Sequence, residues 1–319
     1  MHKIPVGVLG ASGYAGRELC AIVARHPSMQ LAFATANEQR GQRARLGGAE
    51  VRFVAHDDAP LANAELVFSA LPHGASAAWV ERVRGAGARA VDLSSDLRPG
   101  HGAAPVPYGL TEVTRDQLPN AGVVANPGCY PTAILMALLP LARRGLIAPG
   151  ATVTANAASG VTGAGLSPRT ELLFGEVTED FKAYGIANTH RHLAEMRSML
   201  NATGADADLI FTPHLLPVAR GILATITVPL TTELENPLAP WQEDFANEPF
   251  VEVDPEPPTL RDVVRRNVVR ISARHVQGVR QPTLLVLSAI DNLVKGAAGQ
   301  AVQNANVVLG IEEPVGLPL

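Results

Sequence analysis

Short apolar runs recur along the first 128 residues and alternate with segments that have the spacing of amphipathic helices. The apolar runs, each about as long as a buried strand, cover residues 6–9, 31–35, 65–71, 89–95 and 122–126. Leu19, Ile22 and Val23 give an apolar face to a helix that follows the first run, and residues 74–87 form a second helical segment. Strands that alternate with helices predict a Rossmann-type, doubly wound parallel sheet.

The pattern changes after residue 128. Longer alternating runs cover residues 151–159, 208–216, 221–230 and 283–290. They predict a mostly antiparallel sheet with helices on one face, and residues 292–310 have the pattern of a further helix. We therefore expect an α/β chain of two domains. The first holds residues 1–128 and is completed by a C-terminal helix at about 293–319. The second is an α+β domain of residues 129–292, whose sheet is the expected surface for a homodimer or homotetramer.

The first strand leads into a turn, GASGYAG, in which glycine recurs at every third position, at Gly10, Gly13 and Gly16. Without Cβ atoms, such a turn bends tightly and lets a pyrophosphate approach the N–H groups that open the next helix. Ser12 and Tyr14 complete the turn. Because a doubly wound sheet binds its dinucleotide at the carboxyl edge, we expect these five residues at a cofactor site.

The end of the second strand indicates which dinucleotide binds. NAD sites usually present Asp or Glu at this point to bind the ribose 2′-hydroxyl. Here the strand ends at Thr35, and Asn37 and Arg40 follow shortly afterwards. Small polar groups followed by an arginine suit a 2′-phosphate, so these residues predict NADP(H), although an arginine that only coats a solvated loop fits the same pattern.

Composition and charge narrow the class of partner. The 319 residues have a net charge of −4 and are 47% hydrophobic. A net charge of −4 gives no broad basic surface that would bind nucleic acid or an anionic membrane, so we expect a small-molecule substrate. The longest apolar stretch, residues 133–142, is far shorter than the ~20 residues that span a bilayer. Two cysteines cannot build a disulfide framework, and a strand begins too early for a signal peptide, so we expect a cytoplasmic protein without a metal site.

One of the two cysteines, Cys129, lies in ANPGCYPT, directly before a long apolar helix. Pro131 suits the first turn of that helix, so Cys129 is expected at its N-terminus. An ordinary thiol, with a pKa of ~8.5, is only a few per cent thiolate at neutral pH. A helix end supplies ~0.3–1 kcal/mol, less than one pKa unit, so a nucleophilic Cys129 needs a basic partner as well. Cys20, flanked by apolar residues of the first helix, is expected in the core.

The segment THRHLAEM offers that partner. His192 and Glu195 are three residues apart, about one turn of a helix, so the carboxylate can orient the imidazole. His190 lies two residues before His192 and is expected to point elsewhere. The spacing alone does not place His192 beside Cys129.

The segments GASGYAG, NPGCYPT, SGVTGAG, THRHLAE and AIDNLVKG together resemble the N-acetyl-γ-glutamyl-phosphate reductases, relatives of the aspartate-semialdehyde dehydrogenases. The resemblance runs from residue 6 to about residue 310, and the cysteine motif is highly specific to this family. It implies an oxidoreductase of arginine biosynthesis that reduces an acyl phosphate with NADPH through a cysteine thioester. In that chemistry Cys129 is the nucleophile, His192 the general acid/base and Glu195 its support.

The resemblance also implies binding residues. Substrate-binding roles fall to Arg98, Ser159, Thr162 and Tyr184, and cofactor-binding roles fall to Asn292 and Lys295. The sequence departs from the family pattern at Leu166, where many relatives carry Lys or Arg. Arg169, three residues later, is the candidate to supply that charge to the substrate.

Other functions fit part of the sequence. The lysine-pathway homologue, which reduces an aminoadipyl phosphate borne on a small acidic carrier protein, would use the same chemistry and favour a basic rim around the pocket. A non-catalytic NADP-binding sensor would have no need of a helix-capped cysteine. A cysteine hydrolase would leave the glycine turn unexplained, and aspartate-semialdehyde dehydrogenase itself has a different cysteine motif.

Overall fold

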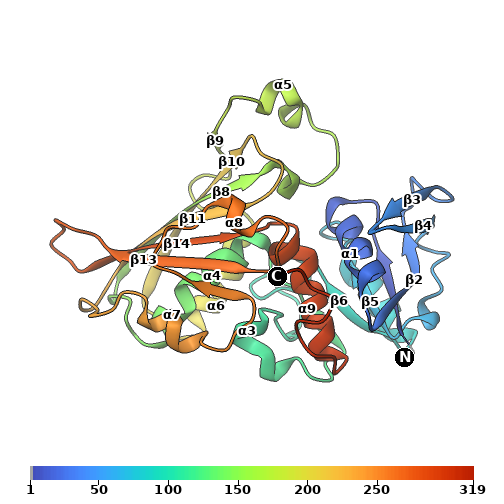
Figure 1. The fold of residues 1–319 in the computed structure, drawn as a ribbon, viewed down its shortest axis with the longest axis horizontal. Helices are drawn as coiled ribbons and strands as arrows, with labels where there is room; N and C mark the ends of the chain where they lie inside the picture. Colours follow the sequence, from blue (N-terminus) through green and yellow to red (C-terminus); the bar gives the residue numbers. More distant parts are fainter. Residues whose placement is uncertain (1–2) are drawn as a thin grey trace. The chain divides into compact units, whose positions relative to one another are not determined.

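The computed structural model describes residues 3–319, which form two compact units (Figure 1). Unit 1 consists of the chain up to Gly128 together with Ala297–Pro318, and unit 2 consists of Cys129–Gly296 with the final residue. Apart from the final residue, the chain therefore passes between the units twice, at 128–129 and at 296–297.

The sheet of unit 1 confirms the predicted doubly wound fold. Its strands, in spatial order, are β3 (Arg43–Leu46), β4 (Ala49–Val54), β2 (Met29–Thr35), β1 (Ile4–Leu9), β5 (Leu66–Ser69), β6 (Arg89–Asp92) and β7 (Val123–Ala125). All neighbours pair in parallel except β3 and β4, which form an antiparallel hairpin at one edge. The apolar pattern of the sequence does not predict this hairpin, because charged residues alternate along β3 and leave it without an apolar run.

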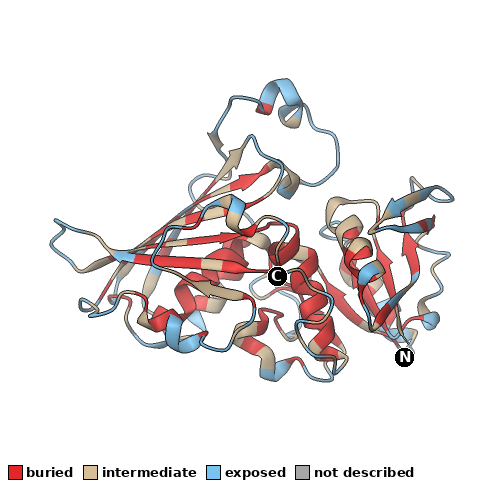
Figure 2. Cartoon of the chain, in the orientation of Figure 1, coloured by how far each residue is buried: buried red, intermediate tan, exposed pale blue. Residues whose placement is uncertain are grey.

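Helices cover both faces of this sheet. On one face, α1 (Tyr14–Arg25) and α9 (Gly299–Val308) share a core with the strands, in which Leu19 and Val302 are fully buried. On the other face, α2 (Ser76–Gly85) buries Val80 and Val83 against the strands. This two-sided burial explains why the strands read as continuous apolar runs (Figure 2).

The sheet of unit 2 is mixed and mostly antiparallel, as predicted. Its strands, in spatial order, are β12 (Val251–Val253), β13 (Val269–His275), β14 (Thr283–Ile290), β11 (Ile222–Pro229), β8 (Ala151–Gly160), β10 (Ala207–Leu216) and β9 (Lys182–Ala183). Only β8 with β10 and β12 with β13 pair in parallel. Strand β13 was not predicted from the sequence, because arginines interrupt its apolar pattern.

The remaining helices are short, apart from two that pack together under the second sheet. They are α3 (Thr111–Thr114), α4 (Cys129–Arg143), α5 (Phe174–Val177), α6 (His192–Asn201), α7 (Ala239–Asp244) and α8 (Leu260–Val263). Helices α4 and α6 contact each other, and α4 also contacts β11 and β14. Within residues 3–319, no helix combines the length and apolar character needed to cross a membrane.

Helix α4 is the central element of unit 2 and is buried on all sides from Tyr130 to Ala142. Pro140 lies inside it and has no N–H to donate to the carbonyl of Met136. The indole Nε1–H of Trp241, on α7, donates to that carbonyl at 3.2 Å and to the carbonyl of Ala137 at 3.1 Å. The buried tryptophan thus satisfies an acceptor that the proline leaves open.

Trp241→Phe is therefore expected to destabilise the protein. The change leaves the Met136 carbonyl buried without its donor, which costs about 1–3 kcal/mol before any loss of packing. Urea unfolding measures the difference in free energy. Trp79→Phe is the matched control, because Trp79 is half-buried and its ring contact with the Arg82 guanidinium, at 3.8 Å, is available to phenylalanine. Equal losses in the two variants would contradict this account.

The C-terminal segment differs from the single helix predicted over 292–310. Val294–Ala298 form a π-helical turn, and α9 follows it. The buried carboxylate of Asp291 accepts the N–H groups of Leu293 and Val294, and the carbonyl of Asp291 accepts the N–H of Gly296 at 2.8 Å. These bonds widen the first turn.

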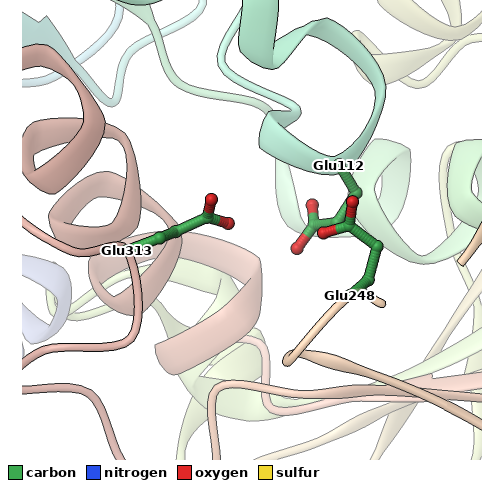
Figure 3. Close-up of side chains that lie close together, drawn as sticks. All are labelled: Glu112, Glu248 and Glu313. Atoms are coloured by element: carbon green, nitrogen blue, oxygen red, sulfur yellow. The ribbon is translucent and has the colours of Figure 1, made fainter. Parts of the chain in front are cut away.

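Helix α9 also carries amide side chains where only an apolar face was expected. Gln300, Gln303, Asn304 and Asn306 are all fully buried. Gln303 donates to the carboxylates of Glu112, at 2.8 Å, and of Glu313, at 2.7 Å, both drawn in Figure 3. The helix is therefore held to its own unit by polar contacts as well as by packing.

Candidate active site

Cys129 is the first residue of α4 and remains partly exposed, as the sequence predicts. The next residue, Tyr130, is buried, and its hydroxyl lies 2.8 Å from that of Tyr184. Burial, as the largest cause, and the charge of Cys129 raise the pKa of both tyrosines, to about 12 for Tyr184. The tyrosines therefore remain neutral hydrogen-bonding groups beside the cysteine at physiological pH.

Both histidines of the THRHLAEM segment lie against Tyr130. The ring centroid of Tyr130 is 6.0 Å from that of His192 and 5.5 Å from that of His190, and the two imidazoles are 4.8 Å apart. The expectation that His190 points elsewhere is wrong. It failed because residues 182–190 do not form a regular helix, so helical spacing does not apply before α6 begins at His192.

Helix α6 places the predicted acid/base pair on one buried turn. His192 is the first residue of this helix, and Glu195 follows in the same turn. His192 is 4% exposed, and Glu195 is fully buried. A buried carboxylate and an imidazole at this spacing suit the predicted orienting role, which remains a prediction.

The pKa of His190 is lowered to about 4, first by burial and then by the charge of Arg191. Its Nδ1 accepts the backbone N–H of His192 at 3.2 Å, which also requires the neutral ring. As pH falls from about 6.5, the usual pKa of histidine, towards 4, His190 becomes protonated in the unfolded chain but stays neutral in the folded protein. His190 therefore stabilises the fold fully above that window and less within it.

His190→Gln is accordingly expected to weaken the dependence of stability on pH. Between pH 7 and pH 4.5, its melting temperature should fall by less than that of the unmodified protein. Differential scanning calorimetry at both pH values measures the two differences. A variant that loses as much stability on acidification as the parent would contradict the assignment.

The predicted substrate residue Ser159 lies near the end of β8, and Thr162 lies in the turn that follows and bonds to Asn292. Asn292 donates to the Thr162 hydroxyl at 2.9 Å and accepts the N–H of Gly221 at 2.8 Å. Ser159 hydrogen-bonds to Tyr130, which partly offsets the rise in the pKa of that tyrosine. Asn292, predicted to bind cofactor, thus has its amide engaged within unit 2.

Lys295, Arg98 and Arg169 occupy different environments. Lys295 is fully buried, with its ammonium 5.4 Å from the centre of the Phe250 ring, a position that favours a structural role. Arg98 belongs to unit 1 and donates from Nε to the carbonyl of Asn126 at 2.8 Å, three residues before Cys129. Arg169 is exposed in the segment before α5, so its substrate role remains a prediction.

The glycine turn opens α1, as predicted. Gly10 has a φ of +75°, and a Cβ at Gly16 would lie 2.2 Å from the Gly10 carbonyl oxygen, so both positions require glycine. Gly13 differs, because the nearest atom to its added Cβ is 3.8 Å away. The side of the turn at Gly13 is therefore open beside the N–H groups of α1, which fits a pyrophosphate. Tyr14 is the first residue of the helix, and the backbone carbonyl of Ser12 accepts a hydrogen bond from Nε of Arg17.

The predicted 2′-phosphate residues lie at the carboxyl end of β2. Thr35 is fully buried, and its hydroxyl accepts the N–H of Gly10 at 3.2 Å. His56, which the sequence analysis missed, lies 2.5 Å from the same hydroxyl through Nδ1, and its backbone N–H donates to Asn37. Asn37 and Arg40 are exposed. Thr35 therefore braces the turn, whereas Asn37 and Arg40 are accessible to a ligand.

Both units match described domain families. Residues 5–121 match the semialdehyde dehydrogenase NAD binding domain, and residues 129–292 match the semialdehyde dehydrogenase dimerisation domain. The structure is similar to aspartate semialdehyde dehydrogenase II of Vibrio cholerae, in complex with ASA, with a TM-score of 0.78 and 17% identity over 97% of this chain and 99% of that one. It is also similar to aspartate semialdehyde dehydrogenase of Candida albicans with NADP, with a TM-score of 0.70 and 16% identity over 96% and 98% of the two chains. At these identities the likeness shows the fold alone.

Sequence similarity gives the nearer relationship. The chain is 41% identical to N-acetyl-gamma-glutamyl-phosphate reductase of Halorhodospira halophila, over 98% of both chains. It is 40% identical to the enzyme of that name from Laribacter hongkongensis, over 99% of this chain and 98% of the relative. The chain therefore belongs to the N-acetyl-gamma-glutamyl-phosphate reductase family, a family of reductases built on the semialdehyde dehydrogenase domains.

Proposed function

We propose that this protein reduces N-acetyl-γ-glutamyl phosphate to N-acetylglutamate semialdehyde and phosphate with NADPH, in arginine biosynthesis. The observation that carries the proposal is the position of Cys129, partly exposed at the first residue of α4, next to the tyrosine that contacts His190 and His192. The names of relatives that are 37–41% identical over nearly the whole chain support the substrate.

The residues of unit 2 suit a covalent route. The Cys129 sulfur attacks the acyl-phosphate carbonyl, the C–S bond forms, and the C–O bond to phosphate breaks to leave a thioester. NADPH, when bound, would supply the hydride that reduces the carbonyl carbon of this thioester. N–H groups at the start of α4 stabilise the negative charge that develops on the carbonyl oxygen of the acyl group bonded to Cys129. His192 then provides a proton as the C–S bond breaks and the aldehyde leaves.

NADP(H), rather than NAD(H), is the cofactor that we propose. The open side of the glycine turn accommodates a pyrophosphate, and the exposed Arg40 follows β2 at the point where NAD sites usually carry an acidic residue. Arg40→Ala should therefore raise the Kd for NADPH and leave the Kd for NADH unchanged, as measured by nicotinamide fluorescence. No change in either Kd would assign Arg40 to the solvated loop, and an equal rise in both would mean that Arg40 does not distinguish the 2′-phosphate.

We also propose that the protein is a homodimer or homotetramer. Residues 129–292 match a dimerisation domain, and unit 2 exposes large apolar side chains between residues 166 and 210, among them Phe174 at 84% and Ile186 at 59% exposure. Several large apolar side chains exposed in one segment of the chain suit an interface. Light scattering at several concentrations gives the mass, and a monomer at all of them would contradict the proposal.

Cytoplasmic location is part of the same proposal. Cys20 and Cys129 are not joined in a disulfide within residues 3–319, and the proposed chemistry requires a reduced thiol at position 129. Cell fractionation, with an antibody against the protein, tests the location.

The proposed function is tested most directly in the reverse direction. With N-acetylglutamate semialdehyde and NADP, NADPH should form beyond about one equivalent per Cys129 only when phosphate is present, because phosphate must cleave the thioester before a second turnover. Continued formation without phosphate would indicate a hydrolytic aldehyde dehydrogenase. Parallel assays with the aminoadipyl semialdehyde on its carrier protein, and with aspartate semialdehyde, compare kcat/KM values. A higher value for either would reassign the substrate.

A further inference from the structure

The two segments at which the chain changes unit lie close together: Gly296, at the end of the second segment's unit 2 part, contacts Cys129. Within unit 2, a Cβ built at Gly296 would be 2.8 Å from the Cβ of Cys129 and 3.2 Å from its Cα. Real Cβ atoms essentially never approach this closely, so any larger residue would displace the cysteine. Gly296 does not have a left-handed φ, so its backbone conformation does not itself require glycine. The close approach to Cys129 is the feature that does.

Gly296 belongs to the π-helical turn, where its N–H donates to the Asp291 carbonyl five residues earlier. Single π-turns are uncommon and frequently occur at functional sites. Here the turn presents the Cα of Gly296, rather than a side chain, to Cys129.

Within unit 1, the side chain of Asn126 links the segment before Cys129 to the segment that begins at Ala297. Its Nδ2 donates to the carbonyl of Ala297 at 3.3 Å, and its Oδ1 accepts from Nδ2 of Asn304 at 2.9 Å. Its backbone N–H donates to the carbonyl of Asp92, and its carbonyl accepts from Arg98. The residue three positions before Cys129 is therefore bonded through both its backbone and its side chain.

Asn304, on α9, is itself held in one orientation. Its Nδ2 also donates to the carbonyl of Gly109 at 2.9 Å, and its Oδ1 accepts from the Thr111 hydroxyl at 2.7 Å. All of these groups are buried or nearly so. The side-chain amide of Asn304, on α9, is thus held in place and in turn holds Asn126.

We propose that Gly296 and Asn304 are positioning residues for Cys129, with Gly296 leaving room for it and Asn304 holding the segment that leads into it. The proposal rests on the proposed role of Cys129 as nucleophile. Displacement of a reacting group by about 1 Å can reduce a rate about 10²-fold, so small shifts at these positions matter.

Gly296→Ala and Asn304→Leu test the proposal, each with a matched control. Gly85→Ala places the same methyl group at a helical glycine with open space, and Asn306→Leu removes another buried amide of α9, which bonds to the carbonyls of Glu313 and Val315. For each variant, kcat and KM, the Kd of NADPH, the melting temperature, and the pH profile of iodoacetamide alkylation of Cys129 in the free protein are measured.

Both test variants should lower kcat at least tenfold relative to their controls, change KM and the Kd of NADPH by less than threefold, and shift the alkylation profile of Cys129. A kcat and an alkylation profile that match those of the controls would overturn the proposal. If Gly296→Ala does not fold, the Asn304 pair decides. Alkylation requires no substrate, so it reports on these residues even if Cys129→Ala remained active and the proposed function failed.

Discussion

Cys129→Ala is expected to abolish reduction of the acyl phosphate, with kcat falling by ~10⁴-fold or more, because no other group can form the thioester. NADPH binding should be unchanged, since the predicted cofactor residues of the glycine turn lie in unit 1. Stopped-flow detection of NADPH oxidation measures the rate, and fluorescence titration measures binding. Undiminished turnover would refute the covalent route.

Cys20→Ala is the matched control for that result. Cys20 is fully buried on α1, and burial raises its pKa to about 12, so it remains a protonated thiol at neutral pH. Its replacement should leave kcat within about twofold. In the unmodified protein, iodoacetamide should label Cys129 before Cys20, and the reverse order would contradict both assignments.

His192→Ala is expected to lower kcat by ~10²–10⁴-fold, the range for loss of a general acid/base, with a smaller change in KM. The imidazole lies on the first turn of α6, beside the tyrosine that adjoins Cys129. The dependence of kcat on pH should lose the limb that reports the acid/base group.

His190→Ala is the necessary comparison, because the structure places this second imidazole 4.8 Å from the first. Burial lowers the pKa of His190 to about 4, so it is neutral at physiological pH. A buried neutral ring suits support of the cluster better than proton transfer, so His190→Ala should reduce kcat less than His192→Ala. A loss below tenfold for His192→Ala, with a larger loss for His190→Ala, would move the role to His190.

The predictions that succeeded rest on local signals. The glycine spacing at residues 10–16 predicts the strand, turn and helix that the structure contains, because tight turns and helix starts depend on a few adjacent residues. Likewise, the prolines around Cys129 predict its place at a helix start, and α4 begins there. Buried parallel strands produce apolar runs that are visible in the sequence.

The failures involve elements whose stability comes from distant partners. Strand β13 contains two arginines, and it exists because β14 pairs along its whole length. The π-turn depends on the carboxylate of Asp291, and no residue pattern marks it. The charged β3–β4 hairpin extends the edge of the first sheet by pairing with β2 and with itself, and only Val51 and Phe53 of the hairpin are buried.

By itself, the sequence determined the class of each domain, the turn that suits a dinucleotide and the helix start that bears the cysteine, because each depends on neighbours within a few positions. Only the tertiary structure decided which side chains surround Cys129. Tyr184 and both histidines meet at Tyr130, the residue after Cys129, although the tyrosines are 54 residues apart, and Gly296 reaches the cysteine from the far end of unit 2. Such contacts arise from the packing of helices and loops on a sheet, and the spacing of residues along the chain does not predict them.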